Sequence, residues 1–173
     1  SITDGYINVN DILKADIVRY RHNVLEQISV NDFDFEANQG IYEGDSVWIV
    51  KFTCKKPNIF NSGSPNATNY IGELTINKQN FAVLKVVSQI SYSSLSPLGV
   101  EFFANQQSQY QNAKATYSIT YKKLNSKYVV NAINYSLSYT ENGKNVTNNF
   151  VLKNKQTETQ NLKIINEKTY FVK

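Results

Sequence analysis

The sequence has few of the residues from which catalytic and metal centres are usually built. It contains one cysteine and one histidine among 173 residues. A single cysteine, Cys54, excludes an intrachain disulfide and a cysteine-based zinc site. Only seven glycines and three prolines are present, which argues against a linker-rich or repetitive protein. No apolar run approaches the roughly 20 residues that a membrane-spanning helix needs.

What the chain does contain is enough apolar material for one folded domain, which we place at residues 1–173. Hydrophobic residues make up 41% and aromatic residues 13%. The net charge of +4 is spread along the chain, and the tightest basic groups are two lysine pairs, at 55–56 and 122–123. Nucleic-acid binding needs a denser basic stripe, so we expect no nucleic-acid partner. The first residues do not read as a leader. The protein is therefore either cytosolic, or a leader, with or without more of the chain, has been removed.

The first element predicted from periodicity is a helix over residues 11–28. Leu13, Ile17, Tyr20, Val24 and Ile28 recur at spacings of three and four, which describes one face of an α-helix. We expect this stripe to pack on the rest of the domain. The alternative is that part of the segment is a linker to an upstream domain.

After this segment the period changes from 3.6 to 2. Residues 47–54 alternate and are rich in β-branched and aromatic side chains, and residues 32–38 are a candidate partner strand. Strands follow around residues 70–76 and 82–90, with a loop at 57–67.

A second short helix is predicted over residues 97–113, where Pro97 can occupy the first helical position. The last third then gives the strongest strand signals. Asn142-Gly143 predicts a tight hairpin, and a final strand or two fall in 161–172. We therefore predict a mainly β (α+β) domain. Its core is a single curved antiparallel sheet or half-barrel of seven to nine strands, over residues 32–172, with two helices.

Several of these strand motifs, in their order along the chain, carry a family resemblance. They are YEGDSVWIVKF at 42–52, YIGELTI at 70–76, FAVLK at 81–85 and the hairpin at 115–131, preceded by DILKADIVR at 11–19. Together they resemble cell-envelope proteins that carry a carboxypeptidase-regulatory-like domain. The resemblance covers about residues 11–165, and one departure is Asn77, where that family more often has Asp.

The resemblance implies an expected location and fold. It implies a periplasmic or outer-membrane-associated protein of a Gram-negative cell, with a curved sheet similar to the lipoprotein-carrier (LolA-like) fold. The regulatory domain itself, a small β-sandwich, is not visible, so this chain would be the region that follows it. The resemblance brings no catalytic residue.

No catalytic constellation is visible in the sequence. His22 follows the basic residues Arg19 and Arg21 without a nucleophile fixed near it, and we interpret it as a surface residue. Cys54 is in phase with Trp48 and Phe52, so we expect a small core residue. Asp32, Asp34 and Glu36 could hold a hard cation, but we interpret them as a solvated strand face. A glycosidase with paired carboxylates ranks last, and we predict no enzyme, no metal and no cofactor.

Tyrosine is abundant, and there are 12 of them. Five (Tyr117, Tyr121, Tyr128, Tyr135 and Tyr139) fall in neighbouring predicted strands. They could form a contact surface or a sugar-stacking site. We favour cross-strand pairs that stabilise the sheet.

Two functions remain from the sequence. The first is a binding module whose apolar groove takes a lipid, a lipoprotein or a peptide. That groove would be lined by five strand residues, Trp48, Phe52, Leu74, Leu84 and Val86. The second is a structural or docking domain that follows an upstream domain. A carbohydrate-binding module is less favoured than either.

Overall fold

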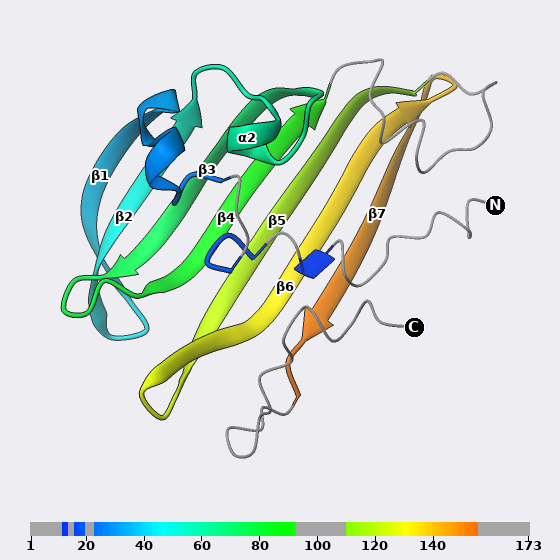
Figure 1. Cartoon of the computed structure of the whole chain (residues 1–173). Coiled ribbons are helices and arrows are strands. Elements are labelled where there is room, and N and C mark those ends of the chain that lie inside the picture. The colour runs from blue at the N-terminus through cyan, green and yellow to red at the C-terminus, as the bar shows by residue number, and fades with distance from the viewer. Residues whose placement is uncertain (1–11, 14–15, 20–22, 93–109, 156–173) are drawn as a thin grey trace, which may run out of the picture.

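The structure, a computed structural model, describes residues 12–13, 16–19, 23–92 and 110–155 (Figure 1). These residues form one seven-stranded antiparallel sheet in which the strands follow chain order from β1 to β7. The elements are a 3-10 helix η1 (Gln27–Asp32), β1 (Phe33–Tyr42), β2 (Asp45–Cys54), a one-turn helix α2 (Ile59–Ser62), β3 (Ala67–Asn77), β4 (Val83–Tyr92), β5 (Tyr110–Leu124), β6 (Lys127–Glu141) and β7 (Lys144–Lys153). The prediction of a mainly β, antiparallel fold is confirmed.

Tight turns with left-handed residues produce this simple strand order. Asn142 and Gly143 have φ angles of 49° and 76°, and Glu43 and Gly44 have 51° and 90°. Two consecutive positive φ angles give the mirror-image turn whose twist matches that of the flanking strands. The hairpin predicted at Asn142-Gly143 is therefore confirmed. The strand predicted at 32–38 is also confirmed, as the longer β1.

One face of the sheet, which we call the core face, carries the hydrophobic core. Register places aromatic and aliphatic residues of successive strands opposite one another on this face. Its fully covered members include Phe52, Leu74, Val86, Ile119 and Ile133. The opposite, outer face carries the alternate residues of each strand and is mostly polar. The sheet therefore has one apolar and one mostly polar face, because successive side chains of a strand point to opposite faces.

Two β-bulges shift the phase that simple alternation predicts. At the start of β4, Ile76 pairs with Val83 whereas Thr75 pairs with Lys85, so Leu84 is the extra residue. In β6, Thr120 pairs with Ala132 and Tyr121 with Val130, so Asn131 is extra. Val83 and Val130 therefore pack on the core cluster, and the predicted groove residue Leu84 is not part of that cluster.

The continuous helix predicted over 11–28 is wrong in the part that the structure describes. Ile12 and Leu13 are helical, but residues 17–19 and 24–25 are turns and η1 begins at Gln27. Polar side chains compete with the helical ladder here. The Asp16 carboxylate accepts from the Val18 N–H at 3.2 Å, and the Asn23 amide oxygen accepts from the Leu25 N–H at 2.8 Å.

The side-chain stripe of this segment still faces the core for part of its length. Ile17 and Val24 are buried, whereas Ile28 is 87% exposed. The helix predicted over 97–113 is wrong at its end, because residues 110–113 belong to β5, and 97–109 lie outside the described residues. The strand predicted at 161–172 also lies outside them.

Candidate functional site

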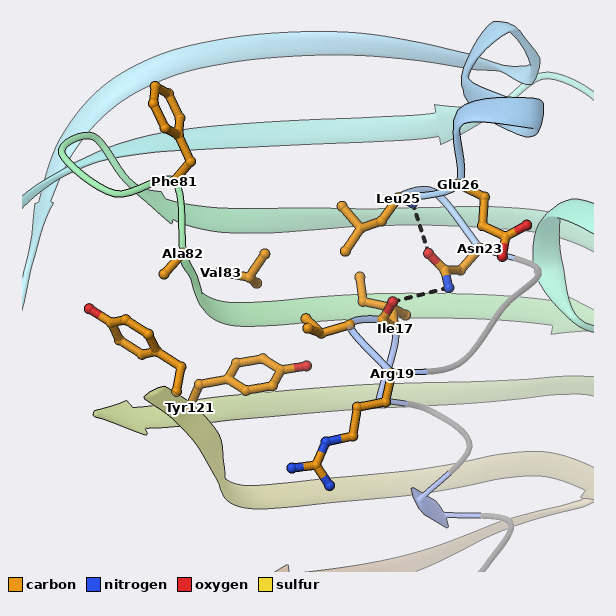
Figure 2. Close-up of a pocket in the computed structure, with 11 residues that line it drawn as sticks. Ile17, Arg19, Asn23, Leu25, Glu26, Phe81, Ala82, Val83 and Tyr121 are labelled. Atoms are coloured by element: carbon orange, nitrogen blue, oxygen red, sulfur yellow. Dashed lines mark hydrogen bonds between the residues drawn. The ribbon is translucent and has the colours of Figure 1, made fainter. Parts of the chain in front are cut away.

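The site with the clearest apolar character is a cavity of about 430 Å³ on the core face, which we call the cleft (Figure 2). One wall consists of residues 17–19 and 23–26, near the N-terminus, and the other is the turn between β3 and β4 with the first residue of β4. The end of β5 and the start of β6 complete it. Its lining consists of Ile17, Val18, Arg19, Asn23, Leu25, Glu26, Phe81, Ala82, Val83, Tyr121 and Tyr128.

The N-terminal wall is held in place by burial and by one long-range hydrogen bond. Ile12, Ile17 and Val24 pack into the core cluster. The Tyr121 hydroxyl donates to the Asp16 carboxylate at 2.6 Å, and both residues are buried. Asn23 adds a hydrogen bond from its side-chain amide to the Ile17 carbonyl at 3.1 Å. These contacts fix two turns of irregular backbone against β5, so the cleft exists without a continuous helix.

Tyr121 is the residue that joins this wall to the sheet. Burial, the hydrogen bond to Asp16 and the charge of Asp16 all raise the pKa of Tyr121 well above its ordinary value. The phenol therefore stays protonated over the physiological range and serves as a donor. Arg19 Nε lies 3.4 Å from the other carboxylate oxygen of Asp16, so the carboxylate is shared between a phenol and a guanidinium.

The opposite wall shows an unusual backbone at Phe81. This residue has a φ of +57°, a conformation that is rare for a bulky side chain. The turn before it is fixed by Asn77, whose side-chain oxygen accepts from the Gln79 and Asn80 N–H groups, and the Phe81 N–H donates to the Asn77 carbonyl. The strained backbone leaves the ring 74% exposed. The ring thus adds little to the core.

The mouth of the cleft is apolar and open to solvent. Besides Phe81, Val18 is 52% exposed and Leu25 is 41% exposed. Three large apolar side chains from two distant segments converge on one cavity, which is how small-molecule sites are commonly lined. Polar groups at its margin are few: Arg19, Asn23, Glu26 and the phenol of Tyr128, which accepts from the Asn80 amide at 3.3 Å.

The five residues predicted to line a groove lie elsewhere. Phe52, Leu74 and Val86 are at most 2% exposed and form the core itself. Leu84 is buried at the bulge beside Val83. Trp48 is half-buried near the β1 edge, with Lys78 Nζ 4.3 Å above its ring centroid. None of the five lines the cleft.

A second, more polar hollow of about 620 Å³ lies at the other end of the sheet. Hydroxyl and amide side chains dominate it, and its lining is Thr68, Ser91, Tyr92, Asn112, Ala113, Lys114, Ser138, Tyr139, Thr140, Asn145, Val146 and Thr147. Asn112 has a φ of +55° at an irregularity in β5. Its polar lining makes it a poorer site for an apolar ligand than the cleft.

The remaining candidates from the sequence are distributed as follows. Cys54 is 4% exposed and belongs to the core, as predicted, and burial raises the pKa of its thiol. Asp34 pairs with Lys55 at 3.2 Å, and Asp32 accepts from the Asn61 amide at 3.0 Å. Across the described part of the chain, no three His, Cys, Asp or Glu residues come together as a metal site. His22 lies outside that part.

The tyrosines behave as the cross-strand reading predicts. Tyr117 and Tyr135 pair directly across β5 and β6, with ring centroids 4.8 Å apart, and Tyr135 continues to Phe150 on β7. Tyr121, Tyr135 and Tyr139 are buried. Most of this aromatic set is therefore core rather than contact surface.

The sequence analysis missed the cleft residues because the alternation of apolar and polar residues predicts strands, but it does not predict which segments cover a face of the sheet. Phe81 belonged to a family-like motif but not to a predicted site, and Val18 and Leu25 are not part of the apolar stripe predicted for the helix. One signal could have indicated Phe81. Asn77 and Asn80 predict a tight turn, which places Phe81 after the end of one strand and before the start of the next.

Comparisons with known proteins give no further guide. No family model, no curated protein and no solved structure matches this chain. None of the helices that the structure describes is long and apolar enough to cross a membrane.

Proposed function

We propose that this chain is a non-catalytic binding module of the cell envelope, and that it takes an apolar chain, such as the acyl tail of a lipid or lipoprotein, into the cleft. One observation carries the proposal. The ring of Phe81 is held on a strained backbone at the mouth of an apolar cavity and is 74% exposed. Backbone strain and exposed aromatic surface both cost stability, and neither serves the core.

The size and lining of the cleft support an apolar chain as ligand. Its volume of about 430 Å³ falls within the range of roughly 300–1,000 Å³ that is typical of small-molecule sites. Ile17, Val18, Leu25 and Val83 offer aliphatic surface. Figure 2 shows Ile17, Leu25 and Val83 around the same space as the Tyr121 ring. Burying such surface is the main driving force for binding a hydrocarbon.

The envelope location is part of the same proposal. It is supported by the order of strand motifs that resembles envelope proteins. The non-catalytic role is supported by the lining of the cleft, whose one carboxylate is Glu26 and which contains no histidine or cysteine. The Asp16 carboxylate is held by Tyr121 and Arg19 behind the wall and is 1% exposed, whereas general acid–base chemistry needs groups placed within reach of a bound substrate.

The first test is native mass spectrometry of the purified chain, followed by titration with dansyl-labelled undecanoic acid as the probe. We expect saturable binding at one site. Ala82→Trp places a large ring in the half-buried lining of the cleft and should abolish that binding. Val151→Trp is the matched control, because Val151 is 59% exposed on β7, away from the cleft.

Two outcomes would contradict the proposal. One is the absence of saturable probe binding by the wild-type chain. The other is equal binding by Ala82→Trp and Val151→Trp when circular dichroism shows both to be folded. A docking role is the second candidate function, and it is favoured by a different observation: the exposed edge strand β1.

A further inference from the structure

The two strands at the ends of the described sheet are ten residues long but differ in how they are protected. β7 begins with Lys144 and ends with Lys153. β1, with the sequence FDFEANQGIY, contains no lysine, arginine or proline, and it pairs with β2 without a bulge. Natural sheets usually protect an edge with such residues or with a bulge. β1 has neither.

The outer edge of β1 offers a regular row of backbone groups. The two-residue turn at 43–44 makes Tyr42 and Asp45 a hydrogen-bonded pair, and such pairs recur at every second residue. The Lys55 N–H donating to the Asp32 carbonyl at 2.8 Å continues the same phase. Even-numbered residues of β1 therefore bond to β2. Odd-numbered residues, from Phe35 to Ile41, direct their N–H and C=O groups to the outer edge, where no described strand pairs with them.

The same odd-numbered residues carry exposed apolar side chains on the core face. Ile41 is 80% exposed and Phe35 is 44% exposed. The outer face of β1 carries two carboxylates, Asp34 and Glu36, near one end only. An added strand must therefore present apolar groups on one face and avoid carboxylates on the other.

We propose that β1 pairs with β1 of a second copy of this chain, antiparallel and centred on Asn38, so that two sheets join into one. In this register Phe35 lies opposite Ile41 of the other copy, twice by symmetry, and Ala37 lies opposite Gln39. On the outer face Glu36 lies opposite Gly40. Both exposed apolar side chains of β1 are paired, and no like charges meet.

Other registers of the same hydrogen-bond phase are poorer. Centring on Glu36 would place the two Glu36 carboxylates opposite each other, and centring on Phe35 would place Asp34 opposite Glu36. Like charges directly opposite in a sheet are destabilising. Centring on Ala37 avoids a clash but sets exposed Phe35 against Gln39. The two-fold pairing also closes on itself, as most homo-oligomers do. This inference does not depend on the ligand proposed for the cleft.

The association is tested by sedimentation equilibrium over a range of protein concentrations. We expect a concentration-dependent dimer in the wild-type chain and a monomer in two variants. Ile41→Lys places a charge in the pairing, and Ala37→Pro removes an outward N–H that β1–β2 pairing does not use. Val151→Lys, which introduces the same charge at a position on β7 that is 59% exposed, should remain dimeric. A wild-type monomer at every concentration overturns the proposal, as does a dimer that Ile41→Lys leaves intact.

The register is tested by introducing one additional cysteine at a time and cross-linking it by oxidation. In the proposed register Asn38 lies opposite Asn38, so Asn38→Cys should form a disulfide-linked dimer under mild oxidation. Glu36→Cys lies opposite Gly40 and should not cross-link to itself. The native Cys54, 4% exposed, is the internal control for background oxidation. Preferential cross-linking through Glu36→Cys overturns the register.

Discussion

The two faces of this sheet are built from the same strands, residue by residue, and yet they respond to different physical requirements. In β5, Ala115, Ile119 and Tyr121 are buried on the core face, whereas the outer-face residues Lys114, Thr116 and Thr120 remain at least partly exposed. A shift of one residue would exchange the two sets. The comparison teaches that the core face carries the stability, since apolar burial resides there, and that the outer face chiefly keeps the sheet soluble.

One region of the outer face is buried, so the contrast between a buried core face and an exposed outer face does not hold there. Val47, Thr75 and Asn77 are buried on it, near the turn between β3 and β4. The Asn77 amide donates to the Asp45 carboxylate at 3.0 Å, and the Lys78 N–H donates to the Ser46 carbonyl at 3.0 Å. These two hydrogen bonds hold the turn that precedes Phe81. Part of the outer face therefore supports the cleft on the core face.

The largest expected effect compares two neighbours in β5. Ile119→Ala removes a side chain that is 0% exposed and should lower the free energy of unfolding by about 2–5 kcal/mol through lost burial and a cavity. Thr120→Ala, one residue away on the outer face, should cost less than about 1 kcal/mol. Urea unfolding followed by circular dichroism measures both, and equal losses would contradict the division into two faces.

A second pair of substitutions compares the faces at glycine. A Cβ on Gly72 would lie 2.5 Å from both the Phe52 ring and the Val87 carbonyl oxygen, so backbone would have to move. Gly72→Ala should therefore cost about 1–3 kcal/mol. A Cβ on Gly40, on the outer face, would meet the mobile tip of Ile49 at 2.7 Å. Gly40→Ala should cost clearly less, and the reverse order in urea unfolding would show that the outer face is packed as rigidly as the core face.

A third pair concerns the wall of the cleft. Tyr121→Phe removes the donor to the buried Asp16 carboxylate and should cost about 1–3 kcal/mol, since a buried charged acceptor loses a partner. It should also weaken probe binding, because the N-terminal wall of the cleft loses its hydrogen bond to β5. Tyr128→Phe is the control, as the hydroxyl of Tyr128 bonds only at the surface with Asn80. Equal unfolding midpoints for the two variants would mean that the hydrogen bond to Asp16 does not anchor the wall.

The sequence predicted the sheet well because period-two patterns and turn residues act locally. The alternation around Phe52 and the Asn142-Gly143 turn each specify their structure within a few residues. The segment 11–28 failed because its apolar spacing fits a helix, whereas Asp16 and Asn23 supply local hydrogen bonds that break one. The spacing of the apolar residues alone does not show whether the helix or the local hydrogen bonds will form.

The cleft was beyond sequence reasoning for a different reason. Its walls come from residues 17–19, 23–26 and 81–83, and the hydrogen bond that anchors the N-terminal wall joins positions 105 residues apart. The predicted groove residues Phe52, Leu74 and Val86 were correctly recognised as one apolar face. Alternation does not distinguish an apolar face that is covered from one that stays open, and here these three are covered.

The smallest effect per residue is expected from alkaline pH, and it comes mainly from phenols that are buried on the core face. Burial raises the pKa of both Tyr70 and Tyr121 above the value near 10 that an unfolded chain shows. As pH rises through 10, the unfolded chain loses these protons first. The stability that the neutral phenols contribute is therefore complete below pH 10 and declines above it. At pH 10.5 the loss should be below about 1 kcal/mol for each tyrosine. Urea unfolding at pH 8.5 and 10.5, in a Cys54→Ala background that removes the thiol, measures the decline. Tyr121→Phe should make the decline shallower, and an unchanged slope would show that Tyr121 titrates alike in the folded and unfolded chain.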